Sequence, residues 1–130
     1  MRTIEQSIAF KATPSDVYAA LMDSAKHAEF SGAAADIGSR IGDPMSAYDG
    51  HITGRNIELV PGHRIVQAWR ADEEGWSENH FSTVTFDLEA IRHGTRLHFT
   101  QSDVPDESAD AIAQGWQDHY WSAMKEAFGW

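Results

Sequence analysis

The segment from Asp106 to Trp130 limits the possible folds of this chain more than any other. Apolar residues recur in it at spacings of three and four, which predicts a helix of roughly 20 residues and about 30 Å with one apolar face. The apolar positions are Ala109, Ile112, Ala113, Trp116, Tyr120, Ala123, Met124 and Ala127. Nothing else in the chain is large enough to cover the alternating segments that precede it.

Two residues of this segment need a separate interpretation. Trp121 falls on a different helix face from Trp116, so we expect it to pack against the first helices, contact a partner subunit or be exposed. Gly115 costs a helix about 1 kcal/mol relative to alanine. A glycine at this position indicates close backbone packing or a local bend.

The segments before this helix alternate apolar and polar residues, which is the period of a half-buried strand. They are 2–10, 51–60, 63–70, 81–90 and 95–102, with short strands also expected between 33 and 49. Pro61-Gly62 has the composition of a tight turn. Thr13-Pro14-Ser15-Asp16 and Asp23-Ser24 are helix start signals, so two short helices should follow the first strand.

The order of these elements predicts an α+β fold. A curved antiparallel sheet of about six or seven strands should wrap around the long C-terminal helix. The length of 130 residues fits one hydrophobic core, and no linker or repeat divides the chain. We therefore expect a single domain spanning residues 1–130.

The composition argues against several classes of protein. Acidic residues outnumber basic ones 20 to 10, and the formal charge of −10 repels nucleic acid and anionic membrane surfaces. The absence of cysteine removes disulfides, thiolate zinc sites and cysteine nucleophiles. No segment has the length of a signal peptide core or a membrane span. We expect a cytoplasmic protein with no nucleic-acid partner and no membrane insertion.

Several motifs, taken in order, carry a family resemblance. They are Tyr48–Gly54, Glu58–Arg70, Ser82–Phe86, and Gln114-Gly115-Trp116 followed by Tyr120-Trp121. From about Phe10 to Phe128 the chain resembles the domain named for activators of the Hsp90-chaperone ATPase, a member of the START-like, or SRPBCC, helix-grip superfamily. The resemblance implies a helix-grip fold whose cavity, between the long helix and the sheet, accepts lipids, sterols, polyketides or other apolar molecules. In the eukaryotic co-chaperone this domain is the C-terminal half of a longer protein, so the resemblance implies a pocket more strongly than chaperone regulation.

Strand alternation and the helix stripe together define the predicted pocket lining. It combines aromatic and polar side chains: Gln67, Trp69, Ser82, Phe86, Phe99, Gln101, Trp116, Tyr120 and Met124. The polar members need partners, because burying an unpaired polar group costs several kcal/mol. Either they bond to one another, to water or to the backbone near strand ends, or they face a ligand. The aromatic stripe is likewise either core packing or a ligand platform.

The sequence shows no metal or catalytic motif. His51, His63, His80, His93, His98 and His119 stand singly, without the paired spacing of most zinc sites, so no metal and no cofactor is predicted. His80 and His98 could meet in space and act as a general base, or be surface histidines. Ser82 lacks the context of a nucleophile elbow, and no catalytic residue is predicted.

These observations leave one leading hypothesis and two alternatives. We expect a protein that binds a small hydrophobic or aromatic ligand, such as a lipid, between the C-terminal helix and the sheet. An alternative is a protein-interaction module with a co-chaperone-like role on the Hsp90 chaperone. The acidic segments of this chain, such as Asp72-Glu73-Glu74, are then either solvated or a docking surface for a basic partner. A second alternative is a cavity enzyme of the cyclase or aromatase type, with the titratable candidates His80, His98, Tyr18 and Tyr48. The expected assembly is a monomer or homodimer.

Overall fold

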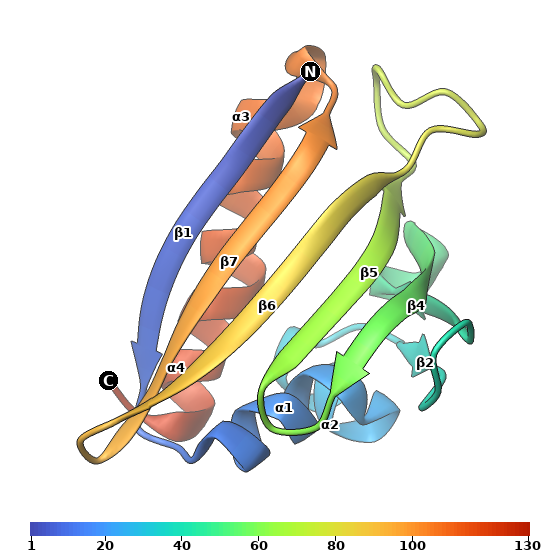
Figure 1. The fold of residues 1–130 in the computed structure, drawn as a ribbon. Helices are drawn as coiled ribbons and strands as arrows, with labels where there is room; N and C mark the ends of the chain where they lie inside the picture. The colour runs from blue at the N-terminus through green and yellow to red at the C-terminus, as the bar shows by residue number, and fades with distance from the viewer.

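The computed structural model describes residues 1–130 and contains one seven-stranded antiparallel sheet (Figure 1). The spatial order is β1-β7-β6-β5-β4-β3-β2, so consecutive strands pair throughout except where β7 returns beside β1. The strands are β1 (Arg2–Phe10), β2 (Asp36–Ile37), β3 (Pro44–Ala47), β4 (Ile52–Val60), β5 (Arg64–Ala71), β6 (Ser82–Ile91) and β7 (Gly94–Val104). The α+β helix-grip fold predicted from the sequence is confirmed.

The two short helices begin at the predicted signals. Helix α1 (Pro14–Met22) starts after Thr13, whose side-chain oxygen accepts a hydrogen bond from the backbone N–H of Asp16 (3.2 Å). Helix α2 (Ser24–Ser31) starts after Asp23 and ends at Gly32, which has a φ of 75°. A short 3₁₀ turn, η1 (Tyr48–Gly50), then connects β3 to β4.

The C-terminal helix crosses the face of β1, β7 and β6, as Figure 1 shows, and has three parts. They are α3 (Asp106–Gly115), a π-helical turn η2 (Trp116–Trp121), and α4 (Ser122–Phe128). In the wide turn the backbone N–H of Ser122 donates to the carbonyl of Gln117, five residues back. The sequence periodicity predicted the helix but gave no sign of this widening.

The expected placement of Trp121 was wrong because of the π turn. In a regular α-helix Trp121 would sit about 140° around the axis from Trp116. The wider turn brings both side chains to the sheet, where their rings stack with centroids 5.6 Å apart and an interplanar angle of 21°. Trp121 is consequently buried in the core.

Gln6 on β1 links the two sides of the wide turn. Its side-chain oxygen accepts a hydrogen bond from the Trp121 indole N–H (2.6 Å), and its amide nitrogen donates to the carbonyl of Ala113 (3.0 Å). One strand residue therefore bridges helix positions on both sides of Trp116. These two bonds stabilise the wide geometry against a regular α-helix.

The core lies between the helix and the concave face of the sheet, as a cluster of 25 buried residues. Helices α1 and α2 cover the end of the sheet near α4 (Figure 1). Eleven alternating positions of β4, β5, β6 and β7 face the core and are buried: Ile52, Ile65, Gln67, Trp69, Ser82, Val84, Phe86, Leu88, Leu97, Phe99 and Gln101. None of the helices has the length and apolarity to cross a membrane.

Candidate functional site

A chain of hydrogen bonds runs through the core from the helix to the sheet. The Trp116 indole N–H donates to the side-chain oxygen of Gln101 (2.8 Å), and the Gln101 amide donates to the hydroxyl of Ser82 (3.0 Å). That hydroxyl donates to the backbone carbonyl of Trp69 (2.8 Å). Because each donor is matched to an acceptor inside the protein, these polar groups are stable without a ligand.

A second buried polar group centres on Asn56, which the sequence analysis did not single out. The Gln67 amide donates to the side-chain oxygen of Asn56 (3.0 Å), and the Asn56 amide donates to the carbonyls of Gly38 (2.7 Å) and Arg40 (3.0 Å). The β4–β5 register shifts between Asn56 and Glu58, and simple alternation does not anticipate a bulge. No buried side-chain nitrogen or oxygen lacks a hydrogen-bond partner.

The space enclosed between the helix and the sheet is small. A void of about 10 Å³ is bordered by Gln67, Phe86, Trp116 and Tyr120 of the predicted lining. Such a void holds about one water molecule. The aromatic rings fill the rest, with the Trp116 centroid 4.4 Å from those of both Phe99 and Tyr120.

A larger hollow lies beside this core, where α3 and η2 pass η1 and the ends of β4 and β5. This cleft has a volume of about 410 Å³ and an apolar floor with a polar rim. Its lining residues are Tyr48, His51, Ile52, Trp69, Ala71, Glu73, Ala111, Ile112, Gly115, Trp116, His119 and Tyr120. Of the predicted lining, Trp69, Trp116 and Tyr120 border the cleft, whereas Ser82, Phe99, Gln101 and Met124 border neither the cleft nor the void.

Tyr48 forms one wall of the cleft. Its hydroxyl donates to the backbone carbonyl of His119 (3.0 Å), and its ring centroid lies 5.8 Å from that of Tyr120. The turn that holds it is tight, with φ values of 50° at Tyr48 and 57° at Asp49. The Asp49 carboxylate secures the turn by accepting from the backbone N–H of Ala34 (2.9 Å). Burial raises the pKa of Tyr48 to about 12, so its phenol is neutral at physiological pH.

His27 and Tyr120 form a buried pair beneath the cleft. Nδ1 of His27 lies 3.1 Å from the carbonyl oxygen of Leu21, and Nε2 lies 2.9 Å from the Tyr120 hydroxyl. A carbonyl only accepts, so Nδ1 carries the proton and the neutral ring accepts the Tyr120 hydroxyl at Nε2. Burial lowers the pKa of His27 and raises the pKa of Tyr120. The sequence analysis missed His27 because no partner is near it in the sequence.

Gly115 faces the cleft from the helix. A Cβ atom built on it would have only one neighbour within 4 Å, the Cδ2 atom of His119 at 3.9 Å. The expectation of close backbone packing at Gly115 was therefore wrong. The alternative was a local bend, and the π turn begins at the next residue.

The titratable candidates from the sequence do not come together. His80 bonds to the carbonyl of Asp103 (2.7 Å), while His98 lies 3.5 Å from the carboxylate of Glu89 on the exposed face of the sheet. Tyr18 does not line the cleft, so Tyr48 alone of these candidates borders it. No group of three or more His, Asp or Glu side chains is placed to hold a metal ion.

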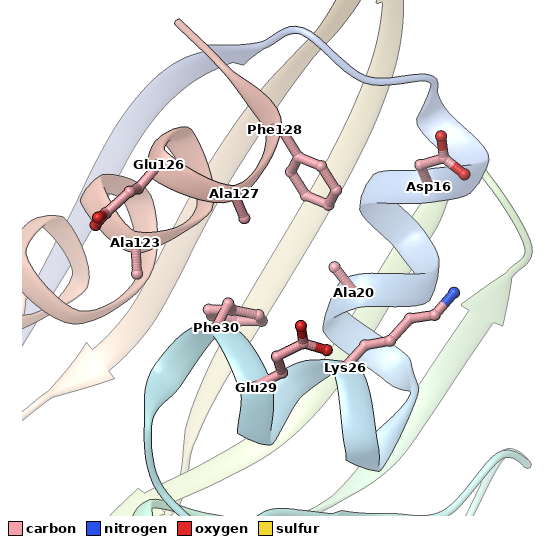
Figure 2. A pocket seen from close by; sticks show the side chains of 9 residues that line it. All are labelled: Asp16, Ala20, Lys26, Glu29, Phe30, Ala123, Glu126, Ala127 and Phe128. Atoms are coloured by element: carbon pink, nitrogen blue, oxygen red, sulfur yellow. The ribbon is translucent and has the colours of Figure 1, made fainter.

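A separate groove of about 600 Å³ lies between α1, α2 and α4 (Figure 2). The rings of Phe30 and Phe128 and the methyl groups of three alanines form its apolar surface, and one basic and three acidic side chains surround it. Its lining residues are Asp16, Ala20, Lys26, Glu29, Phe30, Ala123, Glu126, Ala127 and Phe128. None of them belongs to the predicted pocket.

Comparisons with known proteins agree on one family. The family model described as "Activator of Hsp90 ATPase homolog 1-like protein" matches residues 11–129. The human protein named activator of 90 kDa heat shock protein ATPase homolog 1 is 28% identical over 121 residues, which are 93% of this chain and 35% of that protein. The chain therefore spans about a third of the length of the curated relatives it matches.

Solved structures support the same fold. A crystal structure of an HSP90 activator from Plasmodium falciparum has a TM-score of 0.90 at 21% identity, covering 98% of this chain and 96% of that chain. The solution structure of an Aha1 dimer from Colwellia psychrerythraea has a TM-score of 0.79 at 18% identity, covering 96% and 95%. At these identities the likeness establishes the shared architecture alone.

Proposed function

We propose a ligand-binding function for this chain, which belongs to the Activator of Hsp90 ATPase homolog 1-like protein family. The ligand is a small hydrophobic or aromatic molecule, and it binds in the cleft between the C-terminal helix and the β4–β5 end of the sheet. The cleft has the size of a small-molecule site, and apolar side chains predominate in its lining. It also adjoins the buried rings of Trp69, Trp116 and Tyr120. A ligand there would contact these three of the nine predicted lining residues.

The observation that carries this proposal is the open glycine. Gly115 has a helical backbone, with a φ of −59°, and free space where a side chain would project. Alanine at this position would favour the helix by about 1 kcal/mol and meet no obstacle. Packing therefore does not require the glycine, and the open space beside it belongs to the cleft that it lines.

The test is a ligand screen by thermal unfolding with two variants of one residue. A ligand bound only by the folded state raises stability by about 2.7 kcal/mol at 100 times its Kd. We expect compounds from a series of fatty acids, sterols and aromatic ketones to raise the melting temperature of the unmodified protein. Gly115→Leu places an isobutyl group in the cleft and should abolish the shift, whereas the matched control Gly115→Ala should retain it.

Two results would contradict the proposal. One is that no compound in the series raises the melting temperature. The other is that Gly115→Leu, folded and stable, retains the full shift, because the ligand would then bind elsewhere.

A protein partner is the second candidate function. The human relative is named as an activator of the 90 kDa heat shock protein ATPase, and this chain matches about a third of it. The groove of Figure 2 supports a protein partner, because it combines apolar and acidic side chains on a chain of formal charge −10. An acidic rim around an apolar floor suits a partner with basic and apolar residues.

This candidate is tested by adding the chain to a purified Hsp90-type chaperone and measuring ATP turnover. We expect a change in turnover that Ala127→Trp, which fills the groove, removes. Ala111→Trp, which fills the cleft instead, serves as the matched control and should leave the change intact. A chaperone that neither binds the chain nor changes its turnover excludes this role.

A further inference from the structure

We propose that the ligand of the cleft carries a positive charge, as a protonated amine or quaternary ammonium group attached to an apolar or aromatic body. This inference rests on the proposed function and specifies the chemical class of its ligand. It follows from the charges and hydrogen-bond donors that the lining residues present to the cleft.

Three hydrogen-bond donors of the cleft wall are already occupied within the protein. The Tyr48 hydroxyl donates to the carbonyl of His119, and the Tyr120 hydroxyl donates to Nε2 of His27. The Trp116 indole N–H points into the core, where it donates to Gln101. The backbone N–H of Trp116 donates to the carbonyl of Ile112 within the helix. A carboxylate or phosphate needs donors or cations, and these three side-chain groups offer it none. The remaining side-chain donors of the lining are the Trp69 indole and the imidazoles of His51 and His119, of which His51 already lies beside Glu73.

The charge of the lining also favours a cation. Neither lysine nor arginine lines the cleft, and Glu73 is its one carboxylate. The Glu73 carboxylate lies 3.4 Å from Nε2 of His51, at the rim. The backbone N–H of Asp72 donates to the carbonyl of His51 (2.9 Å), which holds the start of this acidic loop beside the cleft. With Asp72 and Glu74 adjacent and a formal chain charge of −10, the local potential is negative.

The aromatic residues supply the second element of cation recognition. Four of them border the cleft in a connected series, with ring centroids 5.8 Å apart for Tyr48–Tyr120, 4.4 Å for Tyr120–Trp116 and 5.6 Å for Trp116–Trp69. Aromatic rings attract ammonium groups, and cages of such rings bind quaternary amines. A cation on an apolar body would thus contact the rings while its charge faces Glu73.

Three indoles that share a two-carbon side chain and differ in the charged or neutral group at its end provide the test. They are tryptamine, which is cationic, 3-ethylindole, which is neutral, and indole-3-propionate, which is anionic. Binding is followed by ¹H–¹⁵N NMR titration at pH 8, at which histidine side chains are normally uncharged. The backbone amide of Gly115 reports on the cleft. We expect tryptamine to bind about three- to tenfold more tightly than 3-ethylindole, and indole-3-propionate to bind most weakly.

Two neutral substitutions in the same loop separate contact from overall charge. Glu73→Gln should remove the preference for tryptamine and leave the binding of 3-ethylindole unchanged. Glu74→Gln, which removes the same charge from a residue outside the cleft lining, should keep most of the preference. Equal effects of the two substitutions would assign the preference to net charge and overturn the inference.

The remaining outcomes distinguish the inference from the proposed function. If 3-ethylindole or indole-3-propionate binds at Gly115 as tightly as tryptamine, the charge preference is refuted and the ligand cleft stands. If none of the indoles shifts the Gly115 amide, the inference fails. The hydrophobic series with the Gly115→Leu variant then decides the proposed function on its own.

Discussion

Replacing Gly115 by alanine should stabilise this protein, although most substitutions in a folded protein destabilise it. Gly115 already has helical backbone angles, so alanine requires no change in φ or ψ. The added methyl group would meet only the Cδ2 atom of His119, at 3.9 Å, which is an ordinary van der Waals contact. The gain comes from the unfolded chain, because alanine has fewer backbone conformations to lose than glycine.

The size of the effect follows from helix propensity and chain length. Alanine is favoured over glycine inside a helix by about 1 kcal/mol. A chain of 130 residues has an unfolding entropy of about 0.27 kcal/mol per kelvin near 60 °C. The melting temperature of Gly115→Ala should therefore rise by about 4 °C, as measured by calorimetry or by circular dichroism at a fixed scan rate.

Gly54 provides a matched control with the opposite sign. It lies on β4 opposite Trp69, and a Cβ atom there would be 1.8 Å from the backbone oxygen of Ala68. Since backbone cannot rotate away as a flexible side chain can, the β4–β5 pairing must open. Gly54→Ala should destabilise the protein by about 1 to 3 kcal/mol, which is the usual range for overpacking.

A fall in the melting temperature of Gly115→Ala would refute this reasoning. It would mean that the π turn starting at Trp116 needs the conformational freedom of glycine, and that the open space at Gly115 does not explain the residue. Gly115 would then give no support to a ligand in the cleft. An unchanged β4–β5 pairing in Gly54→Ala would separately contradict the steric estimate.

Three further predictions test the buried polar and titratable groups. Gln101→Leu leaves the buried Trp116 indole N–H without an acceptor and removes the donor to the Ser82 hydroxyl, which still donates to the Trp69 carbonyl, so urea unfolding should show a loss of about 1 to 3 kcal/mol. Burial holds the pKa of His27 below its ordinary value. The contribution of neutral His27 to the free energy of unfolding is therefore fully present above the unfolded-state pKa of about 6.5, and it is lost as the pH falls toward the folded-state pKa. In urea melts between pH 7.5 and pH 5, the free energy of unfolding should fall by up to about 1.4 kcal/mol per pH unit. His27→Gln should not show this loss. Burial raises the pKa of Tyr48 to about 12 and the pKa of Tyr120 as well. At about pH 11 the phenolate absorbance of these two residues should therefore stay low, and it should appear only when the protein unfolds, because the pKa of tyrosine in an unfolded chain is about 10. A smooth titration of both residues in the folded protein would contradict this.

The polar core shows where prediction from the sequence stopped. Alternation placed Gln67, Ser82 and Gln101 on the inner face, and the structure buries all three. Their partners were not predictable, because a hydrogen-bond network joins residues far apart in the chain. Asn56 was missed although it lies in phase with Ile52 and before the bulge in β4, so simple alternation from Ile52 would have placed it on the inner face.

The cleft depends on a contact between segments distant in sequence. Tyr48 on a turn after β3 reaches the carbonyl of His119 on the helix, 71 residues away. The sequence named Trp69, Trp116 and Tyr120 as candidates but placed the ligand in the centre of the fold. The structure fills that centre with rings and leaves open space toward Tyr48 and Gly115.

Local sequence determined the strands, the two short helices with their caps, and the apolar face of the segment from Asp106 onward, because these depend on residues close together in the chain. Tertiary structure decided the π turn at Trp116. A regular α-helix would direct Trp121 away from the sheet, whereas the wide turn buries its ring and lets its indole N–H bond to Gln6 on β1. That gain exists only when the strand and the helix are packed together, so no helical periodicity in the sequence records it.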